Sequence, residues 1–383
     1  MANQSLWWVV NMSIESLVRR IIQRLEDLLP KDNENLSPPI LTTNEPGDPA
    51  PEPFAPDQMV RCYECLRANP PTRVNCLYCA AVLPLTETNV NLQKPALRPL
   101  EKWEQGYNNI LLPPQANSAR DFADATLCEA ADLLRLREAD LAMILSSGTP
   151  LPLARAATID EASLVQLRLS SLGFDTRIVP EMEPGAEATG PIRVRAIEID
   201  DAGIYAFQTP EAPAIRVSWS DLVLLVVGRL LVKRVELKEQ TGNGAENRIL
   251  DASEFVNDVT VVDFYTNKQA TPYRIMANGF DFSCLGDRKG LIASENILTL
   301  LNLFRAHAPH AEYDDSFNSV HKALEAVWPS EQQSESTGWH RDRPGKYSIA
   351  SVTERSNEMQ FLRYSRLRYY FQTENVTKTN DNT

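Results

Sequence analysis

The sequence lacks the short motifs that carry the best-known enzyme chemistry. It contains neither the Gly-x-Ser-x-Gly turn that presents a nucleophilic serine nor the glycine-rich Walker loop that binds phosphates. Histidine is scarce, with 4 residues in 383, and none of them lies in a pattern typical of a catalytic triad. These absences argue against the common hydrolase and nucleotide-binding classes, and we expect a protein that is not an enzyme.

Long apolar runs are also missing. The longest, Leu222 to Val232, is interrupted by Gly228 and Arg229 and is shorter than the ~18 residues of a membrane-spanning helix. The apolar stretch at residues 6–10 is too short for a signal peptide, and Met12 offers an alternative start. We therefore expect a cytoplasmic protein without a membrane span.

Basic charge is in short supply. Lys and Arg total 38 against 51 Asp and Glu, which gives a net charge of −13. Because affinity for polyanions comes largely from Lys and Arg, a nucleic-acid role would need a local basic patch. The length of 383 residues and the 43% apolar content predict about two or three ordinary domains.

Four of the 6 cysteines form the strongest chemical pattern in the chain. Cys62, Cys65, Cys76 and Cys79 have the spacing C-x2-C-x10-C-x2-C. Each close pair can present two sulfurs from one tight turn, so the two pairs together predict one tetrahedral Zn²⁺ site. Four protein ligands leave no open position for water, and the predicted role of the ion is therefore structural.

The alternatives for these four cysteines are a redox dithiol or two disulfides, which the paired spacing makes less favourable than zinc. Cys128 and Cys284 lie in apolar contexts and are expected to be buried free thiols. This pattern of cysteine use indicates a reducing compartment.

Residues 60–79 resemble the Ran-binding-protein (nucleoporin) type of zinc finger, whose signature is Trp-x-Cys-x2-4-Cys-x3-Asn-x6-Cys-x2-Cys. Three residues separate Cys65 from Asn69 and six separate Asn69 from Cys76, as in the signature. Val60 stands in place of the tryptophan. The resemblance implies the metal site and its four cysteine ligands.

The same resemblance bears on partners. Ubiquitin-binding members of the family carry a Thr-Phe pair after the second cysteine, where this chain has Leu66 and Arg67. RNA-binding members place an aromatic residue between the two cysteine pairs, and residues 66–75 contain none. Neither specific function is implied for this chain.

The N-terminal part of the chain predicts a helix followed by a linker. In residues 1–30, apolar side chains that include Ile21 and Leu25 recur at three- and four-residue steps, which predicts an amphipathic helix. This helix either packs on the protein body or serves for partner docking or self-association through Ile21 and Leu25. Residues 31–57 are proline-rich and acidic and predict an extended linker, which leads into a zinc ribbon at 58–84.

A second proline-punctuated linker is expected at 85–115, followed by a helical plus βαβ module at 116–180. Within it, residues 151–179 read strand, helix, Gly173 and strand, which predicts a right-handed crossover or a split βαβ unit. This stretch resembles the C-terminal domain of the bacterial ribosomal stalk protein, which implies a small protein-binding α/β module.

Residues 190–372 show strand patterning first and helix patterning afterwards. This order predicts an α+β domain with an antiparallel sheet, and a disordered tail is expected at 373–383. The predicted fold class is therefore multidomain α+β: a small zinc ribbon on flexible linkers, a βαβ module, and a C-terminal antiparallel sheet with helices.

Two functions remain open at this point. The first is a zinc-binding adaptor or scaffold that mediates protein–protein interactions. The alternative is a nucleic-acid-associated regulator that uses the ribbon together with the basic-aromatic stretch at 363–371, in which Arg363 and Arg366 are the candidate contacts. Against the alternative, the arginines of that stretch could pair with the acidic body while its aromatics form core.

Overall fold

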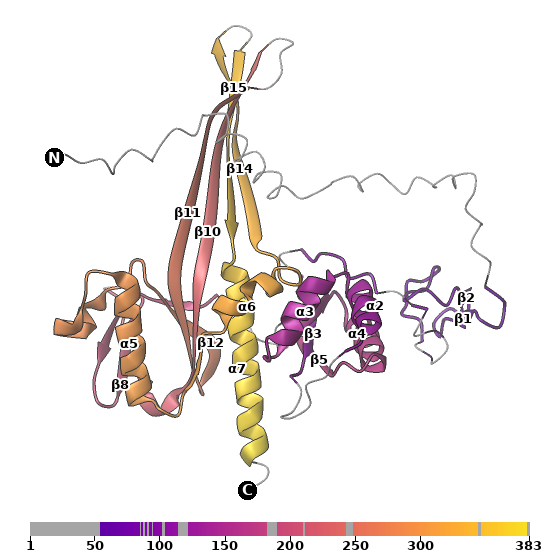
Figure 1. Ribbon diagram of the computed structural model, residues 1–383, viewed down its shortest axis with the longest axis horizontal. Coiled ribbons are helices and arrows are strands. Elements are labelled where there is room, and N and C mark those ends of the chain that lie inside the picture. The colour runs from indigo at the N-terminus through magenta and orange to yellow at the C-terminus, as the bar shows by residue number, and fades with distance from the viewer. Residues whose placement is uncertain are drawn as a thin grey trace, which may run out of the picture. The chain divides into compact units, whose positions relative to one another are not determined.

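A computed structural model describes residues 54–84, 86, 89, 92–93, 95–101, 104–113, 122–181, 190–209, 211–242, 248–343 and 346–380 (Figure 1). The predicted N-terminal helix, with Ile21 and Leu25, and most of the 31–57 linker lie outside these residues. The described chain is mixed α+β, as the sequence predicts. Its described residues divide into a smaller unit, which contains 232–257 and 332–356, and a larger unit within 54–231, 258–331 and 357–380.

The ribbon at 58–84 belongs to the larger unit and contains very little regular structure. Strands β1 (Val60–Arg61) and β2 (Ala68–Asn69) pair antiparallel. Its buried apolar core consists of Val60, Cys62, Cys76 and Leu83. A core this small cannot stabilise a fold by itself, so the segment depends on another source of stability.

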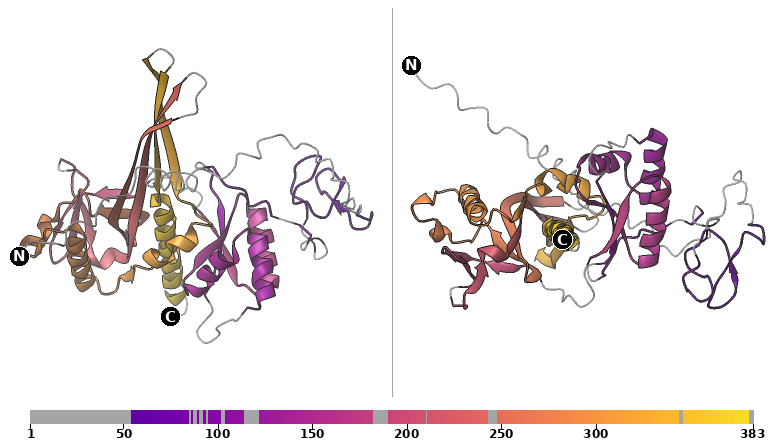
Figure 2. Two further views of the ribbon diagram at one scale, coloured as in Figure 1. Left: turned by 45° about the horizontal axis from the view of Figure 1, so that its top comes forward. Right: turned by 90° about the horizontal axis from the view of Figure 1, so that it is seen from below.

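An α/β module follows the ribbon, with a three-stranded sheet in the order β4-β3-β5. Figure 2 shows its magenta helices in a layer beside the strands. The elements are β3 (Tyr107–Leu111), α2 (Asp124–Leu134), α3 (Glu138–Ser146), β4 (Leu151–Ala156), α4 (Ile159–Ser171) and β5 (Thr176–Pro180). Because β3 lies between β4 and β5 and is antiparallel to both, the unit is a split βαβ rather than a crossover between neighbouring strands.

Strand β3 corrects the expectation that 85–115 is only a linker. Its sequence contains two asparagines, and both are buried. Asn108 accepts a hydrogen bond from the indole N–H of Trp328 at 2.9 Å, and Asn109 donates to the carbonyl of Ala162 at 2.8 Å. Buried polar groups need such partners, and these partners come from distant parts of the chain. The central strand of the module was therefore not predicted, because its two asparagines interrupt the apolar pattern expected of a buried strand.

The rest of the larger unit is built on two sheets. Strands β7 (Ala196–Ile199), β8 (Gly203–Phe207) and β9 (Ile215–Ser218) form one antiparallel sheet, and the 3-10 turn η1 (Trp219–Asp221) leads into the other. The strands of the second sheet that belong wholly or partly to the larger unit are β10 (Leu222–Gly242), β11 (Arg248–Thr266), β12 (Gln269–Met276), β6 (Ile192–Val194) and β13 (Glu312–Asp314). β12 with β6 and β10 with β13 pair parallel, so this sheet is mixed and not antiparallel as expected.

Helices follow and cover these strands. They are the 3-10 segment η2 (Phe282–Arg288), α5 (Ala293–His307), α6 (Phe317–Leu324) and α7 (Glu358–Asn380). Helix α7 continues to Asn380, although the sequence predicts that the ordered domain ends at 372 and that a disordered tail follows at 373–383. Within the described part of the chain, no helix combines the length and the apolar character needed to cross a bilayer.

The smaller unit consists of long strands. It contains residues 232–242 of β10 and 248–257 of β11 together with β14 (Glu331–Arg343) and β15 (Lys346–Ser356) (Figure 1). β15 pairs with β10 from Val232↔Ser356 to Gly242↔Lys346. Neither β14 nor β15 is predicted by the sequence pattern, because both strands are rich in polar side chains.

Gly228 in β10 allows two aromatic rings to approach the backbone. A Cβ added at this position would lie 2.5 Å from Phe361 and 2.9 Å from Phe317, which is closer than the ~3.5 Å at which carbons make favourable contact. We expect Gly228→Ala to lower the free energy of unfolding by about 1 to 3 kcal/mol, measured by urea denaturation. Gly190→Ala, where nothing lies within 4 Å, is the control, and equal effects of the two would contradict this account.

Candidate metal centre

Each cysteine pair of the ribbon sits on the same backbone turn. The amide of Leu66 donates to the carbonyl of Cys62 at 2.9 Å, and the amide of Ala80 donates to the carbonyl of Cys76 at 3.0 Å. Leu66 and Ala80 both adopt left-handed backbone angles, with φ of 59° and 60°. The two turns thus repeat one geometry, in which both sulfurs of a pair can face a single point.

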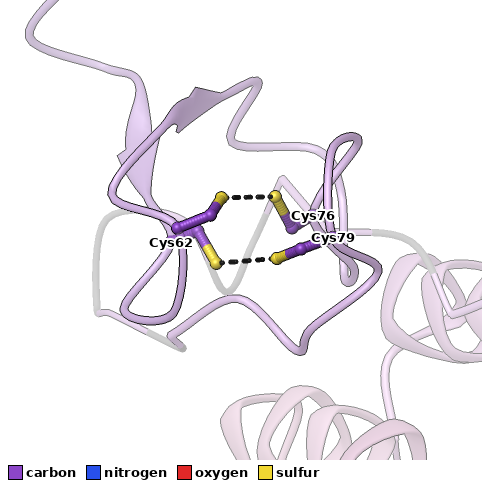
Figure 3. A group of neighbouring side chains, drawn as sticks. Cys62, Cys76 and Cys79 are labelled. Atoms are coloured by element: carbon purple, nitrogen blue, oxygen red, sulfur yellow. Dashed lines mark hydrogen bonds between the residues drawn. The ribbon is translucent and has the colours of Figure 1, made fainter.

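The four sulfurs come together as the spacing predicts. All lie within 4.8 Å of one another, with Cys62 to Cys79 and Cys65 to Cys76 both at 3.6 Å. Figure 3 shows the labelled side chains turned toward each other from the two turns. Zinc with four sulfurs at about 2.3 Å in a tetrahedron places them about 3.8 Å apart, whereas a disulfide bond is about 2.05 Å long. The geometry fits a bound metal ion and excludes disulfides among these thiols.

The environment of Cys76 favours the thiolate that a metal requires. Burial alone would raise its pKa, but N–H groups of the turn and of Asn69 lower the pKa to about 6. The amide of Tyr78 and the side-chain amide of Asn69 each lie 3.4 Å from this sulfur. A proton is therefore lost readily at this position.

Cys79 has the opposite tendency. The amide of Ala81 lowers its pKa, but burial and the three neighbouring cysteine sulfurs raise the pKa to about 12. Four sulfurs this close resist ionising together unless a cation neutralises them. Zn²⁺ would supply that charge, and because protons compete for the same sulfurs, its affinity should fall as the pH is lowered.

Asn69 holds the two turns in place. It is fully buried, donates to the carbonyl of Arg67 at 2.9 Å and accepts from the amide of Leu77 at 2.8 Å. Together with its contact to Cys76, these bonds tie the first turn to the second. The sequence identified Asn69 through the finger resemblance, and the structure gives it a physical role.

We expect Asn69→Ala to weaken zinc binding about 10- to 100-fold, because groups that orient metal ligands contribute on this scale. The measurement is competition against a chromophoric zinc chelator at fixed pH. Asn257→Ala, at an exposed position in the smaller unit, should leave the affinity unchanged. An Asn69→Ala protein that binds zinc as tightly as the wild type would contradict this role.

The other two cysteines do not join the cluster. Cys128 is exposed and Cys284 is half-buried, so the expectation of two buried thiols is wrong for Cys128. Burial raises the pKa of Cys284 to about 11 and keeps it protonated. Among the described residues, the metal-binding group is confined to the ribbon.

The structure places Arg363 in an ion pair rather than at an open surface. Its side chain is 18% exposed and lies 3.2 Å from Glu181, which also binds Arg155 at 2.7 Å. Arg366 is half-buried and already engaged in an interaction. Tyr364 is buried in the core, and Tyr369, Tyr370 and Phe371 are half-buried and pack against it. Residues 363–371 thus present no fully exposed cationic or aromatic side chain of the kind that the nucleic-acid hypothesis used.

Four large apolar side chains that are exposed on the surface of the ribbon were not predicted from the sequence. Tyr63 is 77% exposed, Leu66 68%, Tyr78 55% and Leu77 53%. All four lie between or directly after paired cysteines. A residue whose neighbours face the metal must point outward, so the cysteine pattern could have identified this surface.

Comparison with models of known protein families, with curated proteins and with solved structures finds no match to this chain.

Proposed function

We propose that this protein is a non-enzymatic zinc-binding adaptor and that its ribbon docks onto a protein partner. The observation that carries the proposal is the exposure of four large apolar side chains, Tyr63, Leu66, Leu77 and Tyr78, on a ribbon whose four-cysteine cluster could hold a metal ion. Exposed apolar clusters of this kind mark interaction sites, and large aromatic residues carry most of the energy of such contacts.

The charge of the ribbon supports an apolar mode of docking. Residues 58–84 contain three arginines and one glutamate, a charge of +2, and Zn²⁺ with four thiolates contributes −2. The sum is zero, so docking should depend only weakly on salt. We further propose that 31–57 serves as a tether, that the N-terminal helix contributes docking or self-association, and that the protein acts in the cytoplasm.

The test compares Tyr63→Ser/Leu66→Ser with the wild type. Proteins that co-purify with the wild-type chain are identified and their affinities measured by titration. Loss of two apolar contact residues should lower the affinity for the specific partner at least about tenfold, while the zinc content of the protein stays unchanged. Leu291→Ser, at a fully exposed position outside the ribbon, is the matched control. Unchanged affinity for every partner would refute docking through this surface.

A single-stranded nucleic acid is the second candidate partner, and one observation favours it. The guanidinium of Arg67 lies 4.7 Å from the ring centre of Tyr78, which pairs a cation with an exposed aromatic as base-stacking sites do. Salt separates the two candidates, because binding to nucleic acid would weaken steeply with ionic strength. Replacement of Arg67 by glutamine would then reduce the slope of log affinity against log salt concentration by the amount expected for about one phosphate contact.

A further inference from the structure

A cluster of charged side chains crosses the mixed sheet of the larger unit. Asp263 on β11, Arg274 on β12 and Arg193 on β6 lie opposite one another in register. Arg274 uses both oxygens of Asp263, at 2.7 and 2.8 Å, and also binds Glu358 at 2.9 Å. Both carboxylates bind Arg274. Arg193 lies on β6, which is the last strand at this end of the sheet.

Arg193 has only weak acceptors among the described residues. One of its terminal nitrogens lies 2.8 Å from the sulfur of Met276, and the other lies 3.5 Å from the carbonyl of Asn278. A thioether is a poor acceptor, and five N–H donors of a guanidinium normally find carboxylates, carbonyls or water. Arg193 is half-buried, and burial together with the nearby charge of Arg195 lowers its pKa. The group is therefore a partly desolvated cation whose hydrogen-bond contacts within the described residues include no carboxylate, and the charge of Glu358 only partly offsets the effects of burial and of Arg195 on its pKa.

Arg195 brings a second guanidinium to the same place. Its backbone is fixed on both sides, because its amide donates to Phe207 at 2.8 Å and its carbonyl accepts from Asp281 at 2.7 Å. The two guanidiniums converge on Gly279. A Cβ added there would lie 3.8 Å from Arg195 Nη1 and 4.0 Å from Arg193 Nη2, with no other atom nearer.

The turn beside the two guanidiniums carries backbone N–H groups without a partner in the described part of the chain. Gly279 has φ of +74°, a conformation that suits glycine, and its missing side chain leaves the space between the guanidiniums open. The amides of Asn278, Gly279 and Phe280 have no hydrogen-bond partner within the described ranges. Successive free amides at a turn with a left-handed residue form a concavity that suits anions.

We propose that Arg193, Arg195 and the Gly279 turn form a binding site for a phosphate monoester. Two guanidiniums that approach one point from different strands can share the three terminal oxygens of a phosphate, whereas a carboxylate is satisfied by one planar fork. The whole chain has a net charge of −13, so the pair of arginines at this site is a local feature and not part of a general basic surface. It is independent of the zinc ribbon.

The test is calorimetric titration of the full chain with sodium phosphate, at an ionic strength held constant with sodium chloride. Saturable binding is expected, and Arg195→Gln should weaken it at least about tenfold, because hydrogen bonds to charged groups contribute on this scale. Arg195 is exposed, so its replacement should not disturb folding, and the thermal midpoint checks this point. Arg341→Gln removes the same charge at an exposed position on β14 and serves as the matched control.

Two further ligands distinguish the source of the phosphate. Tighter binding of O-phosphoserine than of inorganic phosphate supports the site and indicates a modified protein, whereas tighter binding of ribose 5-phosphate supports it and indicates a metabolite. Binding by the wild type that does not saturate, an Arg195→Gln protein that binds like the wild type, or an equal loss in Arg341→Gln would each overturn the proposal.

Discussion

Replacement of Cys76 by serine should abolish tight zinc binding and unfold the ribbon at 58–84. Cys76 is buried and receives N–H contacts from Asn69 and Tyr78, so no other ligand can take its place. Zinc binding contributes about 10 kcal/mol or more to domains of this type, and the four-residue apolar core cannot compensate for its loss. The measurements are zinc content and limited proteolysis, which should cut the variant within the ribbon.

The matched control is Cys128→Ser. Cys128 is exposed and lies outside the sulfur cluster, so this variant should keep its zinc and resist cleavage in the ribbon. A Cys76→Ser protein that retained wild-type zinc affinity and protease resistance would show that the ribbon does not depend on a four-sulfur site.

Replacement of Arg274 by methionine should destabilise the larger unit by about 3 to 5 kcal/mol, because it leaves a buried carboxylate without its partner. Asp263 is fully buried and Arg274 is 1% exposed, with two hydrogen bonds between them. The guanidinium also lies 5.2 Å from the ring centre of Phe361, a contact that methionine would only partly replace. The measurement is urea denaturation monitored by tryptophan fluorescence, and the shift of the denaturation midpoint gives the change in stability.

Two variants serve as controls for the loss of stability expected in Arg274→Met. Arg216→Met removes an exposed arginine and should change the stability by less than about 0.5 kcal/mol. The double variant Asp263→Leu/Arg274→Met removes both charges, and apolar replacement of a whole buried pair is often neutral, so it should recover most of the loss. A single variant as stable as the wild type would mean that Asp263 finds another partner.

The metal centre was predictable because its information is local. Two cysteine pairs and Asn69 lie within a short segment, and each pair needs only its own turn to aim both sulfurs. The exposed side chains on those turns follow from the same pattern. The hydrogen bonds that set the protonation of Cys76 were not predictable, because they depend on how one turn docks against the other.

The fold was predictable where hydrophobic patterning is strong, as in α4, where a threonine cap and a glycine stop frame the helix. It was not predictable for β3, whose buried asparagines bind Trp328 and Ala162 far along the chain. Strands β14 and β15 were missed because their side chains are mostly polar, and a strand of this kind is recognised only by its neighbours.

Charged residues were the least predictable part of the chain. Arg363 looked available in the sequence, but its partner Glu181 comes from the end of β5, a separation that no local pattern reports. Arg193 and Arg195 looked ordinary, and only the approach of the Gly279 turn brings them to one point. Pairing of this type depends on tertiary contacts and not on composition.

The most direct test of the account is the metal content of freshly purified, reduced protein, combined with alkylation of its thiols under native conditions. The account predicts one zinc ion per chain, alkylation of the exposed Cys128, and protection of Cys62, Cys65, Cys76 and Cys79 until a chelator is added. A metal-free protein in which all four react as fast as Cys128 would contradict it.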